Sequence, residues 1–121
     1  MAGKKPILLV DDEFSIVEAL VDILQWEGYS VVTAPNGQRA LDELKRGSVS
    51  LVLLDYMMPI MDGLQALEKI RAEPAWRGIP VVMMTAAAIP PGASGWDAIL
   101  QKPFETSALF SVVRRLAGPA G

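Results

Sequence analysis

The sequence contains neither cysteine nor histidine. Without cysteine, the chain can form no disulfide, no thiol nucleophile and no thiolate metal site. Without histidine, it cannot contain a histidine-based catalytic triad, a histidine-bound zinc or a phosphohistidine. The groups that remain for chemistry are carboxylates, hydroxyls, lysines and arginines. Any bound metal would therefore be held by oxygen, which favours magnesium, manganese or calcium.

Long apolar runs and an excess of positive charge are also missing. Charged residues interrupt every apolar segment well before the length of a membrane span. Near the N-terminus only four apolar residues precede Asp11, which is too few for a signal peptide, so a cytoplasmic location is expected. The net charge of −3 argues against nucleic-acid binding through a basic face.

The chain length and composition predict one globular domain. The chain has 121 residues, of which 51% are hydrophobic and 21% charged, and this size supports a single core without disulfides. We expect one domain over residues 1–121, with its core at about 6–117 and no effector domain in the chain. The last four residues, 118–121, are interpreted as a frayed end or the start of a linker.

Short apolar runs alternate along the chain with segments of helical periodicity. Strands are expected at residues 7–10, 29–34, 51–54, 80–84 and, more weakly, 98–101. Helices are expected to end near Gly28, to run from an Asn36 cap to Gly47, to cover 64–71, and to cover 109–116. This alternation predicts an α/β domain in which helices cover both faces of a parallel sheet.

One stretch interrupts the alternation. Two prolines and two glycines lie between Thr85 and Lys102, and they leave no room for a helix of ordinary length. The fourth helix is therefore expected to be short or absent.

Polar residues follow four of the expected strands. Asp11 and Asp12 follow the first strand, Asp55 the third, Thr85 the fourth and Lys102 the fifth. In a parallel α/β sheet, ligands bind beyond the carboxyl ends of the strands. Neighbouring carboxylates there repel one another unless a lysine or a cation offsets their charge, and Mg²⁺ needs only a few protein oxygens.

Each of these residues also has a plainer explanation. The acidic run can be a helix N-terminal cap, Asp55 a turn residue, Thr85 an ordinary strand-end residue and Lys102 a solvated loop lysine. Together, however, they supply a carboxylate nucleophile, a cation site, an ammonium and a hydroxyl. That is the set which phosphoryl transfer to a carboxylate requires.

Four blocks of the sequence carry a family resemblance: ILLVDDE, LVLLDYMMPIMDG, PVVMMTA and LQKPF. In this order they resemble response-regulator receiver domains of two-component signalling, and the resemblance runs from about Pro6 to Leu116. It implies a flavodoxin-like three-layer sandwich with a five-stranded parallel sheet in the order 2-1-3-4-5.

The resemblance also implies the role of each site residue. Asp55 would be the phosphoacceptor, and Thr85 and Lys102 would contact the phosphoryl oxygens. The same resemblance implies a Mg²⁺ site, with Mn²⁺ as a possible substitute. Its ligands would be Asp12, Asp55 and the backbone carbonyl of Met57, with Asp11 acting mainly through metal-bound water.

By the same resemblance, the partners would be a sensor histidine kinase or histidine phosphotransfer protein and a downstream protein or missing effector domain. The chain would be a signalling phosphoacceptor rather than an enzyme. The alternatives are a degenerate receiver acting only as an interaction module and an aspartate-nucleophile phosphatase, although Met57 stands where such a phosphatase has its second aspartate. A P-loop nucleotide binder is excluded because its Gly-x-x-x-x-Gly-Lys motif is missing.

Two departures from the family concern the switch. Ile99 stands where receivers have an aromatic residue, and the segment between Thr85 and Lys102 is shorter than usual. Either the loop from Ala86 to Trp96 reorders on phosphorylation, or it is a constant loop without a switching role. Two further predictions are slow loss of the phosphoryl group, because Met57 and Ala87 are apolar, and packing roles for the tryptophans, Trp26, Trp76 and Trp96.

Overall fold

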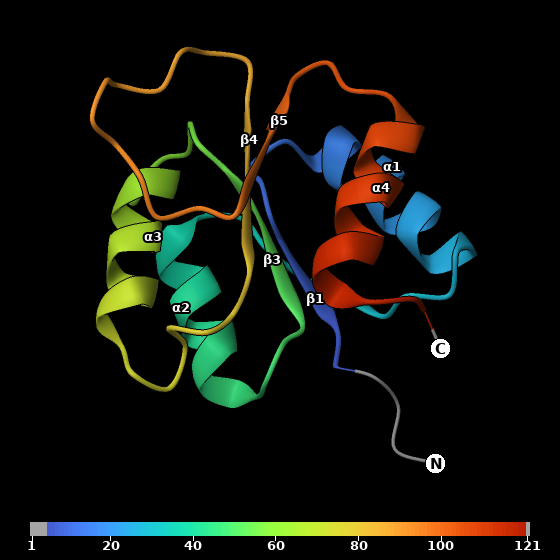
Figure 1. The fold of residues 1–121 in the computed structure, drawn as a ribbon, viewed down its shortest axis with the longest axis horizontal. Helices are drawn as coiled ribbons and strands as arrows, with labels where there is room; N and C mark the ends of the chain where they lie inside the picture. Colours follow the sequence, from blue (N-terminus) through green and yellow to red (C-terminus); the bar gives the residue numbers. More distant parts are fainter. Residues whose placement is uncertain (1–4, 121) are drawn as a thin grey trace.

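The computed structural model describes residues 5–120 and contains one parallel sheet of five strands (Figure 1). The strands are β1 (Ile7–Val10), β2 (Val31–Ala34), β3 (Leu51–Asp55), β4 (Val81–Thr85) and β5 (Ala98–Gln101). Their order across the sheet is β2-β1-β3-β4-β5, which confirms the predicted flavodoxin-like topology. Residues 1–4 and 121 of the predicted single domain lie outside the described residues.

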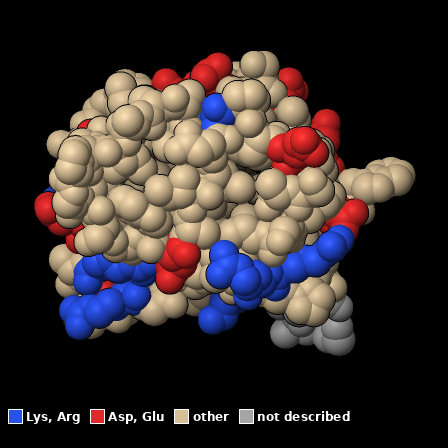
Figure 2. Space-filling view, turned by 45° about the horizontal axis from the view of Figure 1, so that its top comes forward, with Lys and Arg blue, Asp and Glu red and all other residues tan. Residues whose placement is uncertain are grey.

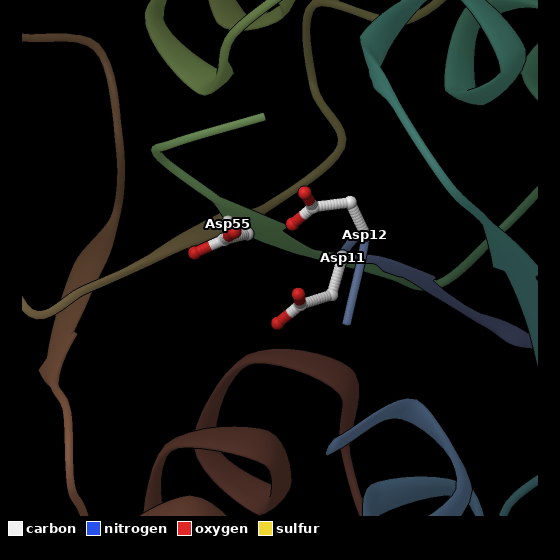
Figure 3. A group of neighbouring side chains, drawn as sticks. All are labelled: Asp11, Asp12 and Asp55. Carbon is white, nitrogen blue, oxygen red and sulfur yellow. The ribbon is translucent and has the colours of Figure 1, made fainter. Parts of the chain in front are cut away.

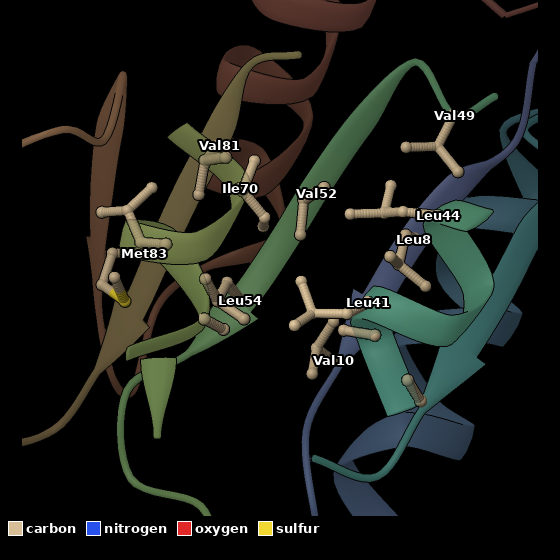
Figure 4. Close-up of a cluster of buried hydrophobic side chains, with 14 residues drawn as sticks. Leu8, Val10, Leu41, Leu44, Val49, Val52, Leu54, Ile70, Val81 and Met83 are labelled. Carbon is tan, nitrogen blue, oxygen red and sulfur yellow. The ribbon is translucent and has the colours of Figure 1, made fainter. Parts of the chain in front are cut away.

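The central strands are apolar because both of their faces are covered. Every residue of β1, β3 and β4 is buried, including the polar residues that end β3 and β4. One core cluster lies on each side of the sheet, and Figure 4 shows the side that packs against α2 and α3. Residues of one strand alternate between the clusters: Leu8 and Val10 belong to one, Ile7 and Leu9 to the other.

Four helices cover the two faces (Figure 1). They are α1 (Phe14–Trp26), α2 (Gly37–Arg46), α3 (Gly63–Ala72) and α4 (Thr106–Ala117). The predicted cap is confirmed, since the Asn36 side chain accepts a hydrogen bond from the Arg39 amide at 2.9 Å. Asp62 and Gln65 form a reciprocal capping box at the start of α3.

Within residues 5–120, no helix lies between β4 and β5, so the expected loss of the fourth helix is confirmed. The β4–β5 segment, residues 86–97, instead runs as a loop from the top of β4 past α3 to the start of β5 (orange in Figure 1). Pro90 and Pro91 each remove a backbone donor that a helix would need.

The packing of Trp26 and the state of the C-terminal end differ from the expectations. Trp26 was expected to pack, but 89% of it is exposed at the end of α1; Trp76 and Trp96 do pack against the core. Helical periodicity predicts that Trp26 lies on the helix. It does not show whether the last turn of the helix still packs on the sheet. Residues 118–121 were interpreted as a frayed end or the start of a linker, and of these two interpretations the frayed end is wrong for the described residues. The Tyr29 hydroxyl donates to the Gly118 carbonyl at 2.8 Å, and Ala120 packs on the core.

Among the described residues, no helix is both long and apolar enough to cross a membrane.

Candidate functional site

The carboxyl ends of β1 and β3 bring three acidic side chains together (Figure 3). Asp11 and Asp12 directly follow β1, and Asp55 is the last residue of β3, the neighbouring strand. One carboxylate oxygen from each of the three residues lies within 4.8 Å of the other two. Asp11 and Asp55 are buried and Asp12 is exposed, so the cluster opens to solvent on one side.

Lys102 lies against this cluster from the end of β5. Its Nζ donates to Asp11 Oδ2 and to Asp55 Oδ1, both at 3.0 Å. Its backbone N–H donates to the Thr85 carbonyl at 2.8 Å, which fixes its position next to β4. One ammonium therefore offsets part of the charge of two buried carboxylates that would otherwise repel each other.

These contacts shift the pKa of both partners. Burial raises the pKa of Asp55, and the charges of Asp11 and Asp12 add to the rise, while the hydrogen bond from Lys102 opposes it. Burial alone would lower the pKa of Lys102, but its hydrogen bonds to Asp55 and Asp11 outweigh burial and raise it. Ionisation of Asp55 therefore costs more free energy in the folded, metal-free protein than in the unfolded chain.

This shift predicts a pH-dependent effect of Asp55→Asn on stability in metal-free buffer. When the pKa of a carboxyl is raised in the folded state, the free energy of unfolding of the protein falls as the pH rises from the unfolded-state pKa through the folded-state pKa. At neutral pH the variant should therefore have a higher Tm than the wild type. The gain should shrink as the pH falls toward the ordinary aspartate value of 3.8 and disappear below it, where the carboxyl is protonated in both states.

Thermal unfolding across this pH range measures the effect, with Asp22→Asn on the exposed face of α1 as the control. An equal Tm for Asp55→Asn and the wild type at neutral pH would contradict the prediction.

Thr85 is buried at the end of β4, but its hydroxyl is bonded to the loop that follows. It donates to the Ala87 carbonyl at 2.7 Å and accepts from the Ala87 N–H at 2.9 Å. Asp55 pairs with Met84 across the two strands, so Thr85 lies one residue beyond Asp55 in the neighbouring strand. Thr85 thus lies at the same end of the sheet as Asp55, and its hydroxyl is held by the β4–β5 segment.

The acidic run after β1 does not form an ordinary helix cap. Glu13 occupies the N-cap position of α1, yet its side chain makes no capping hydrogen bond. Asp11 Oδ1 accepts from the Glu13 N–H at 3.0 Å, which fixes the Asp11 carboxylate with its other oxygen on Lys102. The plainer explanation by helix capping therefore does not account for this run.

Gly63 lets the loop after β3 return close to Asp55. A Cβ at this position would lie 2.4 Å from the Asp55 carbonyl oxygen and 2.9 Å from the Tyr56 Cα. Its N–H donates to the Tyr56 carbonyl at 2.8 Å. Gly63, the last residue of the LVLLDYMMPIMDG block, is thus required by close backbone approach, and the preceding Asp62 caps α3.

Figure 2 shows how charge is distributed on one face. The view turns the top of Figure 1, where β4 ends, toward the reader; most Lys and Arg gather along the lower edge, while acidic side chains are spread over the upper rim and the two sides, with one group low in the centre. The carboxyl ends of the strands thus lie at the more acidic end of the molecule. An oxygen-lined, negatively charged site of this kind fits a divalent cation such as Mg²⁺.

Comparison with known proteins agrees with this geometry. The sequence model of the response regulator receiver domain family matches residues 7–114. Response regulator Rre1 of Synechocystis sp. is 38% identical over 122 residues, which cover 96% of this chain and 53% of that protein. The chain spans about half the length of the curated relatives it matches.

Solved structures give the same result. The receiver domain of the sensor histidine kinase PA1611 from Pseudomonas aeruginosa PAO1 has a magnesium ion coordinated in its active-site cleft. It is 28% identical with a TM-score of 0.87, over 95% of this chain and 98% of that one. Response regulator protein TrrA from Thermotoga maritima, solved with Mg²⁺ and BeF, is 36% identical with a TM-score of 0.85, over 93% and 98%. By sequence and by fold, this chain belongs to the response regulator receiver domains of two-component signalling.

Proposed function

We propose that Asp55 accepts a phosphoryl group from a partner histidine kinase or histidine phosphotransfer protein, and that the product changes the binding of a downstream protein or effector domain. The observation that carries this proposal is the position of the Asp55 carboxylate at the carboxyl end of β3. It shares the Lys102 ammonium with Asp11 and lies close to the carboxylates of Asp11 and Asp12. The role is signalling rather than turnover of a substrate, and a cytoplasmic location is part of the proposal.

The transfer is a displacement at phosphorus. An Asp55 carboxylate oxygen forms a bond to the phosphorus of a phosphohistidine, the P–N bond breaks, and its electron pair stays on the imidazole nitrogen. Because the chain has no histidine, the donor histidine lies outside it. Lys102 lies 3.0 Å from Asp55 Oδ1 and is placed to balance the charge that spreads over the phosphoryl oxygens.

The donor set fits Mg²⁺. In this proposal Asp12, Asp55 and the backbone carbonyl of Met57 are direct ligands, Asp11 acts through a metal-bound water, and Mn²⁺ is a possible substitute. When bound, the ion neutralises charge on the carboxylates and the phosphoryl oxygens. The protein's own contribution is to hold the carboxylates on adjacent strand ends.

Two features support a second function. Ile99 replaces the usual aromatic residue, and the β4–β5 segment contains no helix, so the chain departs from the receiver scheme where the switch is expected. These departures suit a receiver that acts only as an interaction module, without regulated phosphorylation.

Incubation with acetyl phosphate, followed by intact mass measurement, separates the two functions. With Mg²⁺, the wild type should gain one phosphoryl group, and it should gain none with EDTA or in Asp55→Asn. An unmodified wild type with Mg²⁺ would support the interaction module. Repeated turnover of generic phosphoesters would instead support a phosphatase.

The acyl phosphate should be lost slowly. The Met57 side chain is 63% exposed beside the site, and neither it nor Ala87 carries a side-chain group that orients an attacking water by hydrogen bonding. Met57→Asn, which adds an amide there, should shorten the lifetime of the phosphorylated form, with Met57→Leu, which keeps the side chain apolar, as the control. Equal decay rates for Met57→Asn and the wild type, followed by intact mass after removal of the donor, would count against this explanation.

A further inference from the structure

The β4–β5 segment is attached to the rest of the molecule by different contacts at its two ends. Its far end, Gly95 to Asp97, contacts α3 and β4, while its near end contacts Thr85. In Figure 1 it passes beside α3 on its way to β5. The two attachments divide the segment into parts with different freedom to move.

Arg71, on the last turn of α3, binds the far end. Its Nε donates to the Gly95 carbonyl at 2.9 Å, and one of its terminal nitrogens donates to Asp97 Oδ2 at 2.9 Å. The other terminal nitrogen donates to the carbonyls of Arg77 and Ile79 at 2.9 and 2.7 Å. A single planar guanidinium thus joins α3, the loop before β4 and the far end of the segment.

Asp97 continues this connection into the sheet. Its Oδ2, which accepts from Arg71, also accepts from the Val81 N–H at 2.8 Å. Its own N–H donates to the Val81 carbonyl at 2.8 Å. Asp97 therefore joins the first residue of β4 to the residue before β5, and Arg71 holds both. β5 is an edge strand of four residues that pairs with β4 alone, and this attachment adds to that pairing in fixing its position.

The near end has one side-chain attachment, and that attachment belongs to the site. The Thr85 hydroxyl both donates to and accepts from the backbone of Ala87. From Ala86 to Ala88 the side chains are exposed, and Ile89 is the first residue that packs against the core. If the Thr85 hydroxyl turns to a phosphoryl group on Asp55, the contacts of this hydroxyl with Ala87 must be lost.

We propose that Arg71 is a fixed pivot: it holds one end of the β4–β5 segment while the other end moves when Asp55 is phosphorylated. Loss of the Thr85 contact removes the hydrogen bonds that hold the start of the segment, so residues 86–94 shift about the packed Ile89, whereas Arg71 keeps residues 95–97 and β5 in place. Phosphorylation then changes the surface that α3 forms with residues 93–95. It leaves the outer edge of β5 unchanged. This inference rests on the proposed function, because phosphorylated Asp55 supplies the release. Arg71 acts as a positioning residue and touches no reacting atom.

Hydrogen exchange with and without Mg²⁺ and beryllofluoride tests the proposal, with binding at Asp55 followed separately by ¹⁹F NMR. On binding, exchange in the wild type should change within residues 86–94 and remain the same within 95–101. A change that extends through 95–101, or no change anywhere from 86 to 101 despite bound beryllofluoride, would overturn the pivot. Failure of beryllofluoride to bind would instead count against the proposed function.

Substitution of Arg71 tests the pivot without any ligand. Arg71→Met should accelerate exchange of residues 95–101 by roughly tenfold or more, because several hydrogen bonds to a charged group are lost. In this variant the effect of beryllofluoride should spread into β5. Lys69→Met, which removes an exposed charge from the same helix, should behave as the wild type.

Arg71→Lys keeps the charge but not the planar fork, so it should give a smaller acceleration in the same region. It replaces Arg71→Met as the test if that variant does not fold. Unchanged exchange of residues 95–101 in both Arg71 variants would overturn the proposal.

Discussion

Lys102→Met should slow phosphorylation of Asp55 by acetyl phosphate about 10²- to 10³-fold, the usual cost of losing one preorganised donor to a developing oxyanion. The structure gives Lys102 two attachments, to Asp11 Oδ2 and to Asp55 Oδ1, which hold its ammonium beside the acceptor oxygen. Methionine retains most of the side-chain volume and loses the charge. The rate is measured as the appearance of the phosphorylated mass under saturating Mg²⁺.

The same substitution should also destabilise the fold in metal-free buffer. Asp11 and Asp55 are both buried, and removing their shared counter-ion leaves two uncompensated carboxylates, at a cost of about 3 kcal/mol. Lys102→Arg keeps the charge and should retain more of both properties, while Lys69→Met controls for the loss of a surface lysine. Phosphorylation of Lys102→Met at the wild-type rate would contradict the role proposed for this ammonium.

Mg²⁺ should stabilise the wild-type protein, and Asp12→Asn should lose most of this effect. A ligand that binds only the folded state, present at 100 times its Kd, adds about 2.7 kcal/mol to the free energy of unfolding. One carboxylate oxygen from each of Asp11, Asp12 and Asp55 lies within 4.8 Å of the other two, and Asp12 is the exposed member of the cluster. Urea unfolding with Mg²⁺ and with EDTA measures the difference.

Asp22→Asn on α1 is the matched control, since it removes an exposed carboxylate outside the cluster. It should keep the full effect of Mg²⁺. Equal stabilisation of Asp12→Asn and Asp22→Asn by Mg²⁺ would contradict the proposed position of the metal site.

Much of the fold was predictable because short apolar strands alternate along the chain with segments of helical periodicity. The apolar runs of β1, β3 and β5 were located to within a residue, while β2 begins at Val31, two residues later than expected. That difference arises because the Tyr29 N–H bonds back to Leu24 at the end of α1. The strand order came from resemblance to receivers, because alternation alone allows several orders.

The grouping of the site residues was predictable from the same rules. Each of them follows a strand, and parallel strands end at one edge of the sheet, so Asp11, Asp12, Asp55 and Lys102 had to lie near one another. Their chemical roles depend on the resemblance and remain predictions.

Contacts between distant parts of the chain were not predictable. Arg71 appeared only as an ordinary helix residue, because its carbonyl and carboxylate partners lie up to 26 residues away and share no motif with it. The pairing of Asp97 with the start of β4 depends on sheet register, which periodicity leaves open. An acidic residue directly before the last strand was the one available signal.

The central claim is that Asp55 itself carries the phosphoryl group in a Mg²⁺-dependent reaction. Treating the phosphorylated protein with borohydride reduces an acyl phosphate to an alcohol, and tandem mass spectrometry of the peptides then locates the reduced residue. We expect the reduced side chain at Asp55 alone, formed with Mg²⁺ and absent with EDTA. Its appearance at Asp11, Asp12 or another carboxylate, or its formation without any divalent cation, would contradict the account.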